Sequence, residues 1–467
     1  MNGVTVKFGN SSLRTDSRFE RWLHFSYYRF AGIKHFIFRR IRPAGMALCC
    51  VIIIAACLSF GHQKISAYLL FSFSLGMCLM SLPLIFIRRA ELEGRRELPR
   101  FATAGETMDY PVFVRNIGKR PLRRAWLLDT PPDPRPSFDD FHLLKEPGEN
   151  ERNPFDRKFA YFRWTWLLLK NRLFVGGTSA EMINLQPSAG TRIVVTITPL
   201  RRGVIRFDAL RVLLPDVFGV FQGCRKVVAP AATLIVLPRR YPLPPVALPG
   251  GATFRISGET LTNAIGNSGE FVGLRDYRPG DPLRQIHWKS WARTGRPIVK
   301  ELENTYFPRY GLILDTVSTT SSDVQFEETI SVAASFAAAI DTRDTLLDLM
   351  FVKTEAHRVT AGRGLERAER LLEVLAGVTP EREGNYDSLA RLVLLHGDDL
   401  TSCLIIFNGW DEQRANFLKR LTSHGIVCAP IIIGVGKAPS GLPCVWLESG
   451  RIAQDLQSLP GKFAIHS

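Results

Sequence analysis

The sequence predicts three successive parts: a two-helix membrane hairpin, a β-sandwich, and an α/β domain with a parallel sheet. Two uncharged apolar runs near the N-terminus predict the hairpin, and short alternating segments in the middle predict antiparallel strands. Strand patterns that alternate with helix patterns in the last third predict the α/β domain. The 467 residues suffice for two or three domains, and 46% hydrophobic with 22% charged residues is typical of folded protein.

The two apolar runs are 44–61 and 65–87, and neither contains a charged residue. A helix needs about 20 apolar residues to cross the hydrocarbon core, so the second run is long enough and the first is marginal. The short break between them predicts a tight helical hairpin over 44–87, with burial in a soluble core as the alternative. A cleaved signal peptide would begin nearer the N-terminus and would not be followed at once by a second run.

Basic residues flank the hairpin on both outer sides, whereas its tip carries only Lys64. They are Lys34, Arg39, Arg40, Arg42, Arg88, Arg89, Arg95, Arg96 and Arg100. Positive residues stay in the cytoplasm, so the sequence predicts a multi-pass protein of the bacterial inner (plasma) membrane with both termini cytoplasmic. The N-terminal segment 1–43 is basic and aromatic. Within it, residues 19–40 fit either a helix lying in the membrane interface or an ordinary flank of the first span.

The sequence pattern of the region 100–244 predicts a β-rich, sandwich-like domain. Alternating segments punctuated by turn signals predict strands at 110–115, 193–198, 204–207, 210–214 and 232–237. Several short strands at this spacing favour an antiparallel sandwich. The stretch 131–148, rich in proline and acidic residues, predicts a long loop. Proline-rich residues then predict a linker over 245–268.

The segment 269–301 carries most of the information in the chain. Pro279 and Gly280 predict a turn, and Asp281 is a good N-cap for a helix that would continue to about Thr294. Gly295 would end this helix in the left-handed conformation, and a strand would follow at 298–301. Two helix faces are expected, one with Leu283, Ile286 and His287, the other with Arg284, Trp288 and Trp291.

Such a density of Arg, Trp and His leaves three interpretations open. The helix could bind nucleic acid through phosphate contacts and base stacking, or it could dock a protein, because Trp and Arg are the usual hot-spot residues. Alternatively, the charged residues around the turn could form an internal ion-pair network; these are Arg275, Asp276, Arg278 and Asp281. A lone His287 among cations, with no paired carboxylate or nucleophile, is weak support for catalysis.

This segment resembles the signature of the family called domain of unknown function fifty-eight, an R-[DE]-Y-x-P-G-D turn followed by I-x-W-K-x-x-A-R. The matching residues are Arg275, Asp276, Tyr277, Pro279, Gly280, Asp281, Ile286, Trp288, Lys289, Ala292 and Arg293. These residues without Ala292, together with His287, form the candidate binding set. Residues 201–203 and 216–219 are similar to the RRG and DPFG stretches of that family, with Val217 where proline is usual. The resemblance implies a membrane-anchored protein encoded beside MoxR-type AAA+ ATPases.

The last part, 302–467, alternates strands and helices. Strands are expected at 311–314, 346–352, 404–407 and 426–433, with helices at 324–340, 365–376 and 412–423. The resemblance implies a von Willebrand factor A-like fold, in which a D-x-S-x-S loop after the first strand holds a divalent cation. Here Val317 stands at the third position of that loop and has no oxygen to give. Asp315, Thr319 and Asp411 could form only a partial ligand set, so we expect no functional metal site and no cofactor.

Composition and motifs argue against an enzyme. The eight cysteines show neither a CxxC pair nor zinc spacing, and residues 434–437 lack the upstream glycine and the hydroxyl of a P-loop. A formal net charge of +16 fits an anionic partner such as a membrane surface. We therefore expect a non-enzymatic adaptor or scaffold that acts through protein contacts and binds no nucleic acid. The family resemblance implies an AAA+ ATPase as its partner. The alternative is a binder of anionic polymer or nucleic acid through the Arg/Trp-rich helix.

Overall fold

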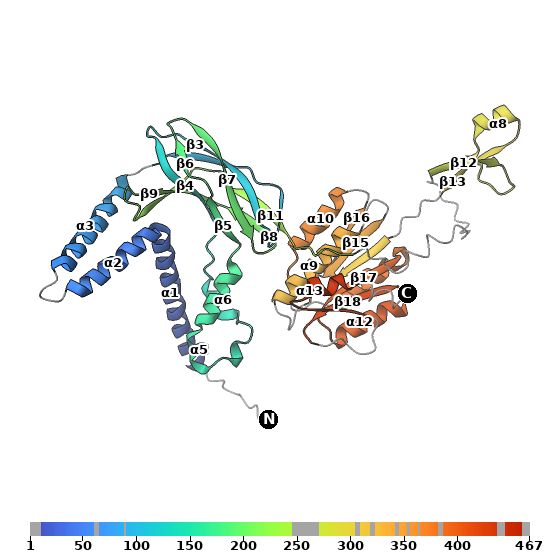
Figure 1. The fold of residues 1–467 in the computed structure, drawn as a ribbon. Coiled ribbons are helices and arrows are strands. Elements are labelled where there is room, and N and C mark those ends of the chain that lie inside the picture. The colour runs from blue at the N-terminus through green and yellow to red at the C-terminus, as the bar shows by residue number, and fades with distance from the viewer. Residues whose placement is uncertain are drawn as a thin grey trace, which may run out of the picture. The chain divides into compact units, whose positions relative to one another are not determined.

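A computed structural model describes the chain at residues 11–59, 65–87, 90–244, 270–303, 309–317, 323–340, 345–352, 355–362, 365–381, 386–436 and 444–459. It forms two compact units, Met1–Arg239 and Arg240–Ser467, each treated by itself below (Figure 1). The predicted linker 245–268 lies outside the described residues.

Three helices open the first unit: α1 (Ser11–Arg40), α2 (Pro43–Ser59) and α3 (Ile65–Ile87). The two apolar runs are therefore helices, as predicted, and they pack against each other as a pair. Within the described ranges, one helical stretch, Ile65–Ile85, is long and apolar enough to cross a membrane, and α2 is a shorter apolar helix. The membrane location and topology of the chain stay predictions.

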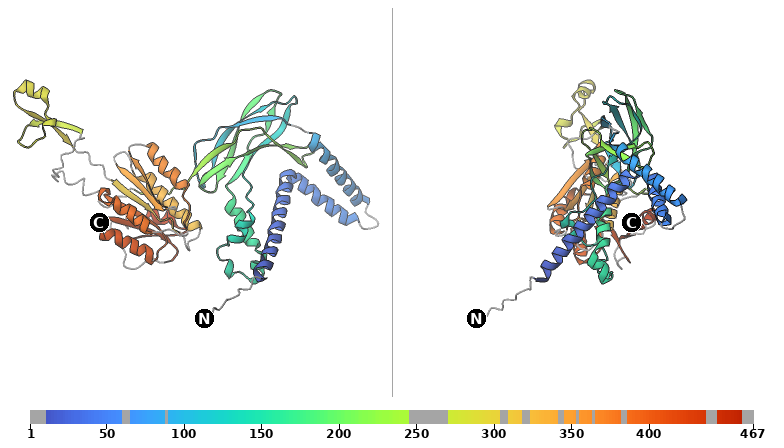
Figure 2. Two further views of the ribbon diagram at one scale, coloured as in Figure 1. Left: turned by 180° about the vertical axis from the view of Figure 1, so that it is seen from behind. Right: turned by 90° about the vertical axis from the view of Figure 1, so that its left-hand side faces the viewer.

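The corner between α1 and α2 is fixed to the β-sheet that follows in the chain. The Arg42 backbone N–H donates to the Val220 carbonyl over 3.0 Å, and Gln222 Nε2 donates to the Arg39 carbonyl over 2.9 Å. A side chain at Gly45 would place its Cβ 2.3 Å from the Val220 oxygen, so only glycine fits there. From this corner α1 and the α2–α3 pair leave in different directions (Figures 1 and 2). The stretch 216–219 directly precedes Val220, so it lies where the apolar helices are attached.

The β-rich part consists of two sheets. An eight-stranded sheet has the order β1-β3-β7-β5-β4-β9-β10, with β6 on β4, and a three-stranded sheet has the order β2-β11-β8. All of these pairs are antiparallel except β2 with β11. The strands are β1 (Leu92–Arg96), β2 (Phe101–Thr103), β3 (Met108–Asn116), β4 (Leu122–Thr130), β5 (Phe174–Ser179), β6 (Ile183–Leu185), β7 (Gly190–Pro199), β8 (Gly203–Phe207), β9 (Ala209–Pro215), β10 (Gln222–Lys226) and β11 (Ala232–Leu237).

One apolar core joins the two sheets. Val112 and Val195 belong to the larger sheet and Phe207 and Leu234 to the smaller one, and all four are fully buried in the same cluster. The five predicted strands are all present, as β3, β7, β8, β9 and β11. The strand β1 begins at Leu92, so the domain starts before the predicted boundary at residue 100.

The predicted loop at 131–148 is wrong in part, because an insertion of short helices follows β4. It contains α4 (Phe138–Leu143), α5 (Pro154–Phe159) and α6 (Tyr161–Asn171). Acidic residues of this insertion lie in the first turns of its short helices. Ser137 Oγ accepts the Asp140 N–H and caps α4, and Asn153 Oδ1 accepts the Asp156 N–H at the start of α5. Acidic residues in a first turn also suit the helix dipole.

In the second unit a six-stranded sheet has the order β16-β15-β14-β17-β18-β19. The predicted all-parallel sheet is wrong at one edge, because β16 runs antiparallel to β15 and the sheet is mixed. Helices α9 and α10 pack together, as do α11 and α12. The strands are β14 (Arg309–Leu314), β15 (Leu346–Val352), β16 (Ala356–Gly362), β17 (Ser402–Asn408), β18 (Cys428–Gly434) and β19 (Val445–Glu448). The helices are α9 (Asp323–Ala339), α10 (Leu365–Ala376), α11 (Tyr386–Leu395), α12 (Glu412–Ser423) and α13 (Ile452–Gln457).

A buried ion pair stabilises the first unit from within its core. Arg96 Nε and Nη2 donate to the two oxygens of Asp129 over 2.6 and 2.9 Å, and the Tyr110 hydroxyl donates to the same carboxylate over 2.9 Å. Burial, followed by the Asp129 charge, raises the pKa of the Tyr110 hydroxyl, which therefore stays protonated and acts as a donor.

We predict that Arg96→Ala destabilises this unit by about 3–5 kcal/mol, because it leaves the Asp129 charge buried without its partner. Calorimetry of the full chain in detergent would show the β-sheet transition lowered by roughly 6–20 °C. Arg95→Ala, on the exposed face of the same strand, is the control and should leave that transition in place. Equal melting temperatures for the two variants would contradict the prediction.

Candidate functional site

The predicted signature is a β-hairpin with a long, structured connection. Strand β12 (Glu270–Asp276) pairs antiparallel with β13 (Ile298–Glu303). Between them lie a 3-10 turn, η2 (Leu283–Gln285), and a short helix, α8 (Trp288–Thr294). We call residues 270–303 the signature hairpin.

An ion pair closes the turn of the signature hairpin. Arg275 Nη1 and Nη2 each donate to one oxygen of Asp281 over 2.7 Å, and the Arg278 backbone N–H donates to Asp281 over 2.8 Å. The hydrogen bonds from Arg275 lower the pKa of the Asp281 carboxyl to about 2. Gly280 has φ +110, which explains glycine at this point of the turn. Of the four residues in the predicted ion network, the geometry pairs the side chains of Arg275 and Asp281.

The predicted helix from Asp281 to Thr294 is wrong in its first half. Ile286 is buried and forms a β-bridge with Val299, and the His287 N–H donates to the Ile298 carbonyl over 2.8 Å. Burying Ile286 against β13 takes its backbone out of the helix. The helix therefore starts at Trp288, and Leu283, Ile286 and His287 do not share a helical face. The predicted end is confirmed, because Gly295 has φ +68 and its N–H donates to the Trp291 carbonyl.

The outer side of α8 combines aromatic and cationic groups. The rings of Trp288 and Trp291 stack with centroids 5.3 Å apart, and the Trp288 side chain is 64% exposed. Lys289 and Arg293 are exposed beside them. His287 Nδ1 lies 2.6 Å from Ser290 Oγ, a contact that orders the start of the helix. This surface offers stacking, cation and apolar contacts, and among the described residues no carboxylate accompanies His287 for acid–base chemistry.

The second candidate site lies at the carboxyl end of the α/β sheet. Numbered within this sheet, the strand order is 3-2-1-4-5-6, and β14 and β17 are the neighbours at which the order reverses. In open α/β sheets, ligands bind outside the carboxyl ends of the strands at such a point. Asp315 directly follows β14, and Asn408 ends β17.

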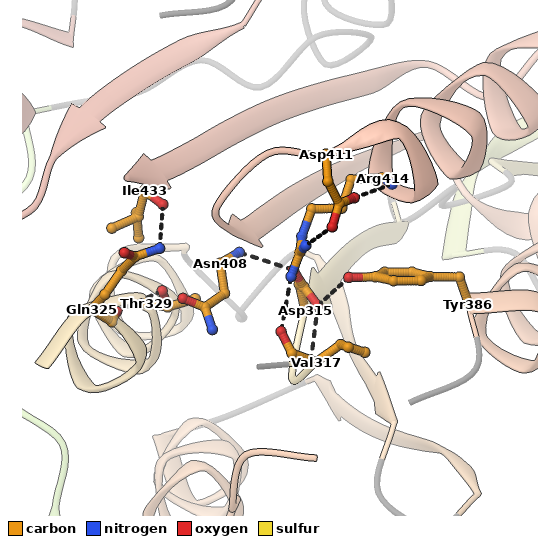
Figure 3. Close-up of polar contacts among 9 residues, drawn as sticks. All are labelled: Asp315, Val317, Gln325, Thr329, Tyr386, Asn408, Asp411, Arg414 and Ile433. Atoms are coloured by element: carbon orange, nitrogen blue, oxygen red, sulfur yellow. Dashed lines mark hydrogen bonds and ion pairs between the residues drawn. The ribbon is translucent and has the colours of Figure 1, made fainter. Parts of the chain in front are cut away.

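Beyond the carboxyl ends of β14 and β17, the Arg414 guanidinium lies beside the Asp315 carboxylate (Figure 3). Arg414 Nε donates to Asp315 over 2.7 Å, its Nη1 to Asp411 over 2.5 Å, and its Nη2 to the Val317 carbonyl over 2.8 Å. Asp315 also accepts from the Tyr386 hydroxyl over 2.9 Å and from the backbone N–H groups of Asn408 and Val317 over 3.0 Å each. We call Asp315, Tyr386, Asp411 and Arg414 the arginine cluster.

In the arginine cluster, burial and the ion pair act in opposite directions on the pKa values of Asp315 and Arg414. Burial raises the pKa of the Asp315 carboxyl, and the Arg414 guanidinium works in the opposite direction. The guanidinium is itself partly desolvated, but Asp315 beside it raises its pKa. Burial and the Asp315 charge raise the pKa of the Tyr386 hydroxyl, so it remains a donor.

The residues at this edge do not fit a divalent cation. The two available carboxylates, Asp315 and Asp411, both face Arg414, and the Val317 carbonyl accepts from the same guanidinium. A cation in this place would meet a fixed positive charge, and Mg²⁺ needs near-octahedral oxygen ligands. Within the described ranges no group of three or more His, Cys, Asp or Glu side chains could hold a metal ion. Thr319, the third predicted ligand, lies outside the described residues.

Sequence reasoning missed Arg414 and Tyr386. The sequence contains a signal for Arg414. This residue occupies the third position of α12, three residues after the N-cap Asp411. Glu or Gln is favoured at that position, and a cation there opposes the helix dipole. A cation so placed indicates an acidic partner elsewhere in the fold. No local pattern singled out Tyr386, which reaches Asp315 across 71 residues of sequence.

These parts define a chain in which apolar helices and an antiparallel β domain precede an α/β domain and a hairpin with an ion-paired turn. Residues 273–401 match the family described as "Protein of unknown function DUF58", and the resemblance of the signature segment to this family is confirmed. The match covers most of the signature hairpin and the α/β domain up to the residue before β17. No curated protein matches the chain.

Three solved structures are similar to parts of the chain. One is the crystal structure of a CARDB domain from Pyrococcus furiosus in complex with di-metal ions, at 10% identity over 31% of this chain and 94% of that one, with a TM-score of 0.14. The solution structure of the same domain has 12% identity over 30% and 94%, with a TM-score of 0.14. Escherichia coli alpha-2-macroglobulin activated by porcine elastase has 12% identity over 34% and 12%, with a TM-score of 0.17. The fold of this chain is defined by its own strand pairings.

The Arg275–Asp281 contact predicts a pH dependence with a definite sign. The folded-state pKa near 2 lies below the unfolded value of about 3.9, so the contact stabilises the hairpin above about pH 4 and is lost as the pH falls through 2. Carboxyl-carbon NMR of Asp-labelled protein should show a midpoint near 2 for Asp281 and one near the ordinary value in Arg275→Gln. Arg278→Gln keeps the backbone donor and is the control. A wild-type midpoint near 4 would refute the contact.

Removing Arg414 should strongly destabilise the second unit. Arg414→Ala leaves Asp315 buried without its counter-charge, at a cost of about 3–5 kcal/mol near neutral pH. The loss should shrink in acid, because burial raises the pKa of Asp315 and favours its neutral form. Arg420→Ala is the matched control, since Arg420 lies on the same helix and pairs with exposed Asp387, a contact worth about 0–1 kcal/mol. Thermal unfolding of the full chain measures both, and similar losses would contradict the prediction.

Proposed function

We propose that this protein is a membrane-anchored, non-enzymatic adaptor that docks a protein partner through the exposed side of α8. The single observation that carries the proposal is the Trp288–Trp291 stack, open on one face and bordered by Lys289 and Arg293. Trp and Arg dominate the binding energy of protein interfaces, because they combine large apolar area with directed polar contacts. Cations around the stack favour an acidic partner surface.

The family resemblance suggests a partner of the MoxR-type AAA+ ATPase class. An adaptor needs a rigid element that presents its contact residues. The bidentate Arg275–Asp281 pair and the buried contact between Ile286 and Val299 supply this rigidity. Neither structural pair uses a residue of the exposed stack, so the stack can bind a partner without disturbing the turn.

Membrane anchoring is supported by the outer surface of the apolar helices. In α2, Ile53 and Ile54 are exposed, and in α3, Leu69, Phe73 and Met80 are exposed. A patch of this kind is costly in water and suits lipid tails. The basic flanks favour a hairpin with its tip outside and both termini in the cytoplasm.

For the α/β domain we propose a von Willebrand factor A-like role without metal. The strand order and the carboxylate after the first strand support the likeness, while the arginine cluster supports cation-independent binding. On this proposal Arg414 holds the loop after β14 in a fixed conformation, a task otherwise performed by a bound ion.

The second candidate function is binding of an anionic polymer or nucleic acid. The same stack of Trp288 and Trp291 favours it, because bases stack on aromatic rings and Arg or Lys contacts phosphates. Salt dependence separates the two functions. A steep loss of affinity for single-stranded DNA between low and moderate salt would favour nucleic acid.

The docking proposal predicts the result of a pull-down from detergent-solubilised membranes. Wild type should recover an AAA+ ATPase, and Trp288→Ala combined with Arg293→Ala should lose it by tenfold or more, since each hot-spot truncation costs about 2 kcal/mol. A matched control, Val204→Ala with Arg206→Ala, removes one exposed apolar and one exposed cationic side chain from β8. Equal recovery by all three proteins would mean that the signature hairpin is structural only.

A further inference from the structure

The insertion after β4 and the N-terminal helix form one packed body. The Tyr27 hydroxyl of α1 donates to the Phe159 carbonyl over 3.0 Å, and the Tyr27 ring lies 5.8 Å from that of Trp164 on α6. Arg163 is buried, donates to Glu149 and lies 3.8 Å from Glu20 of α1. We call α1 together with α4, α5 and α6 the helical layer. It is an ordered structure and more than a flank of the first apolar helix.

An aromatic row crosses the helical layer from one element to the other. Ring centroids are 6.1 Å apart between Trp22 and Phe19, 6.1 Å between Phe19 and Phe159, and 4.6 Å between Phe159 and Phe155. The row ends in exposed side chains on both elements, Trp22 at 60% and Phe155 at 68% exposure. Two segments more than a hundred residues apart thus build one apolar surface.

Exposed cations neighbour the row in sequence on both elements, and exposed acids of the layer, Asp139 and Asp140, lie on α4. Arg18, Arg21, Arg157 and Lys158 are exposed, and Lys158 Nζ lies 5.9 Å from the centre of the Phe19 ring. Glu20 lies 2.6 Å from His142 and 3.8 Å from Arg163, and the Asp156 carboxylate accepts from Asn153 Nδ2 over 2.9 Å. The outer face therefore combines aromatic rings with positive charge.

We propose that the helical layer binds the surface of an anionic membrane, with the aromatic row at headgroup level and the cations on lipid phosphates. Aromatic residues and cations on one amphipathic surface are the pattern of interfacial helices. Further along the layer, Ile33, Leu143 and Leu169 are exposed aliphatic side chains. Acyl chains cover such groups, whereas a nucleic acid would leave them in water. A lipid surface is therefore the occupant that fits both features.

This inference deepens the membrane half of the proposed function and is independent of docking by α8. The α1–α2 corner is tied to Val220, so α1 ends where the apolar helix pair begins. Because α1 and the α2–α3 pair leave this corner in different directions, a pair that crosses the bilayer leaves α1 free to lie along its surface (Figures 1 and 2).

Photo-crosslinking of the full-length protein in native membranes tests the proposal. Benzoylphenylalanine replaces Trp22 or Phe155 in the helical layer, Leu69 in α3, and Val204 on β8 as the exposed control. We expect phospholipid adducts at positions 22, 155 and 69 and none at 204. Protein or nucleic-acid adducts at 22 and 155, or no adducts there, would overturn the proposal. Absence of lipid adducts at 69 alone would overturn the apolar-helix anchor and leave the helical layer supported.

The lipid charge is tested with the same protein in nanodiscs. Combined Arg157→Gln and Lys158→Gln should lower the adduct yield at position 22 severalfold in anionic nanodiscs, because each cation near such a surface contributes roughly a fivefold preference. Zwitterionic nanodiscs should show a low yield for both proteins. Equal yields in the two lipids would overturn the anionic preference. Arg206→Gln on β8 removes one exposed cation outside the helical layer; it is the control and should change nothing.

Discussion

The ion pair between Asp315 and Arg414 is the contact on which the carboxyl edge of the α/β sheet depends. A carboxylate at the end of β14 is buried by the sheet topology and must meet a positive charge or lose its own. Here the positive charge belongs to Arg414, a residue of α12, whereas a bound metal ion could exchange with solvent. The contact ties the loop after β14 to α12, and the Tyr386 hydroxyl adds the start of α11. Three segments separated in the chain are thereby fixed at the edge where such sheets bind ligands.

The same constraint recurs in the first unit, where buried arginines pair with buried acids. Arg96 with Asp129 lies in the β-sheet core, and Arg163 with Glu149 lies in the helical layer. These pairs are neutral, so the net charge of +16 is carried by other residues. Exposed cations on α8 and on the helical layer are two places where it appears. Charge on those surfaces is exposed and available for binding.

Local sequence patterns predict many of the helices and strands. Contacts between residues distant in sequence determine the parts of the structure that these patterns do not predict. Alternation identified β3 and β7, and helical periodicity identified α10 and α12, because burial on one face repeats along each of these segments. The helix expected from Asp281 failed because Ile286 is buried against Val299, a residue on the following strand. The sequence predicts a loop over 131–148, whereas α4 lies there, because this short helix is stabilised by α1, more than a hundred residues earlier. Arg414 was missed for the same reason, since its meaning depends on Asp315.

The signature residues separate into two groups once the hairpin is seen in three dimensions. Arg275, Gly280, Asp281 and Ile286 each have a structural reason, because they close the turn or attach it to β13. Trp288, Lys289 and Arg293 have none of this kind, since they are exposed. A large aromatic side chain in solvent contributes little to folding, which supports our proposal that Trp288 contacts a partner. The structural interpretation therefore applies to the first group, and on our docking proposal this group holds the second in place.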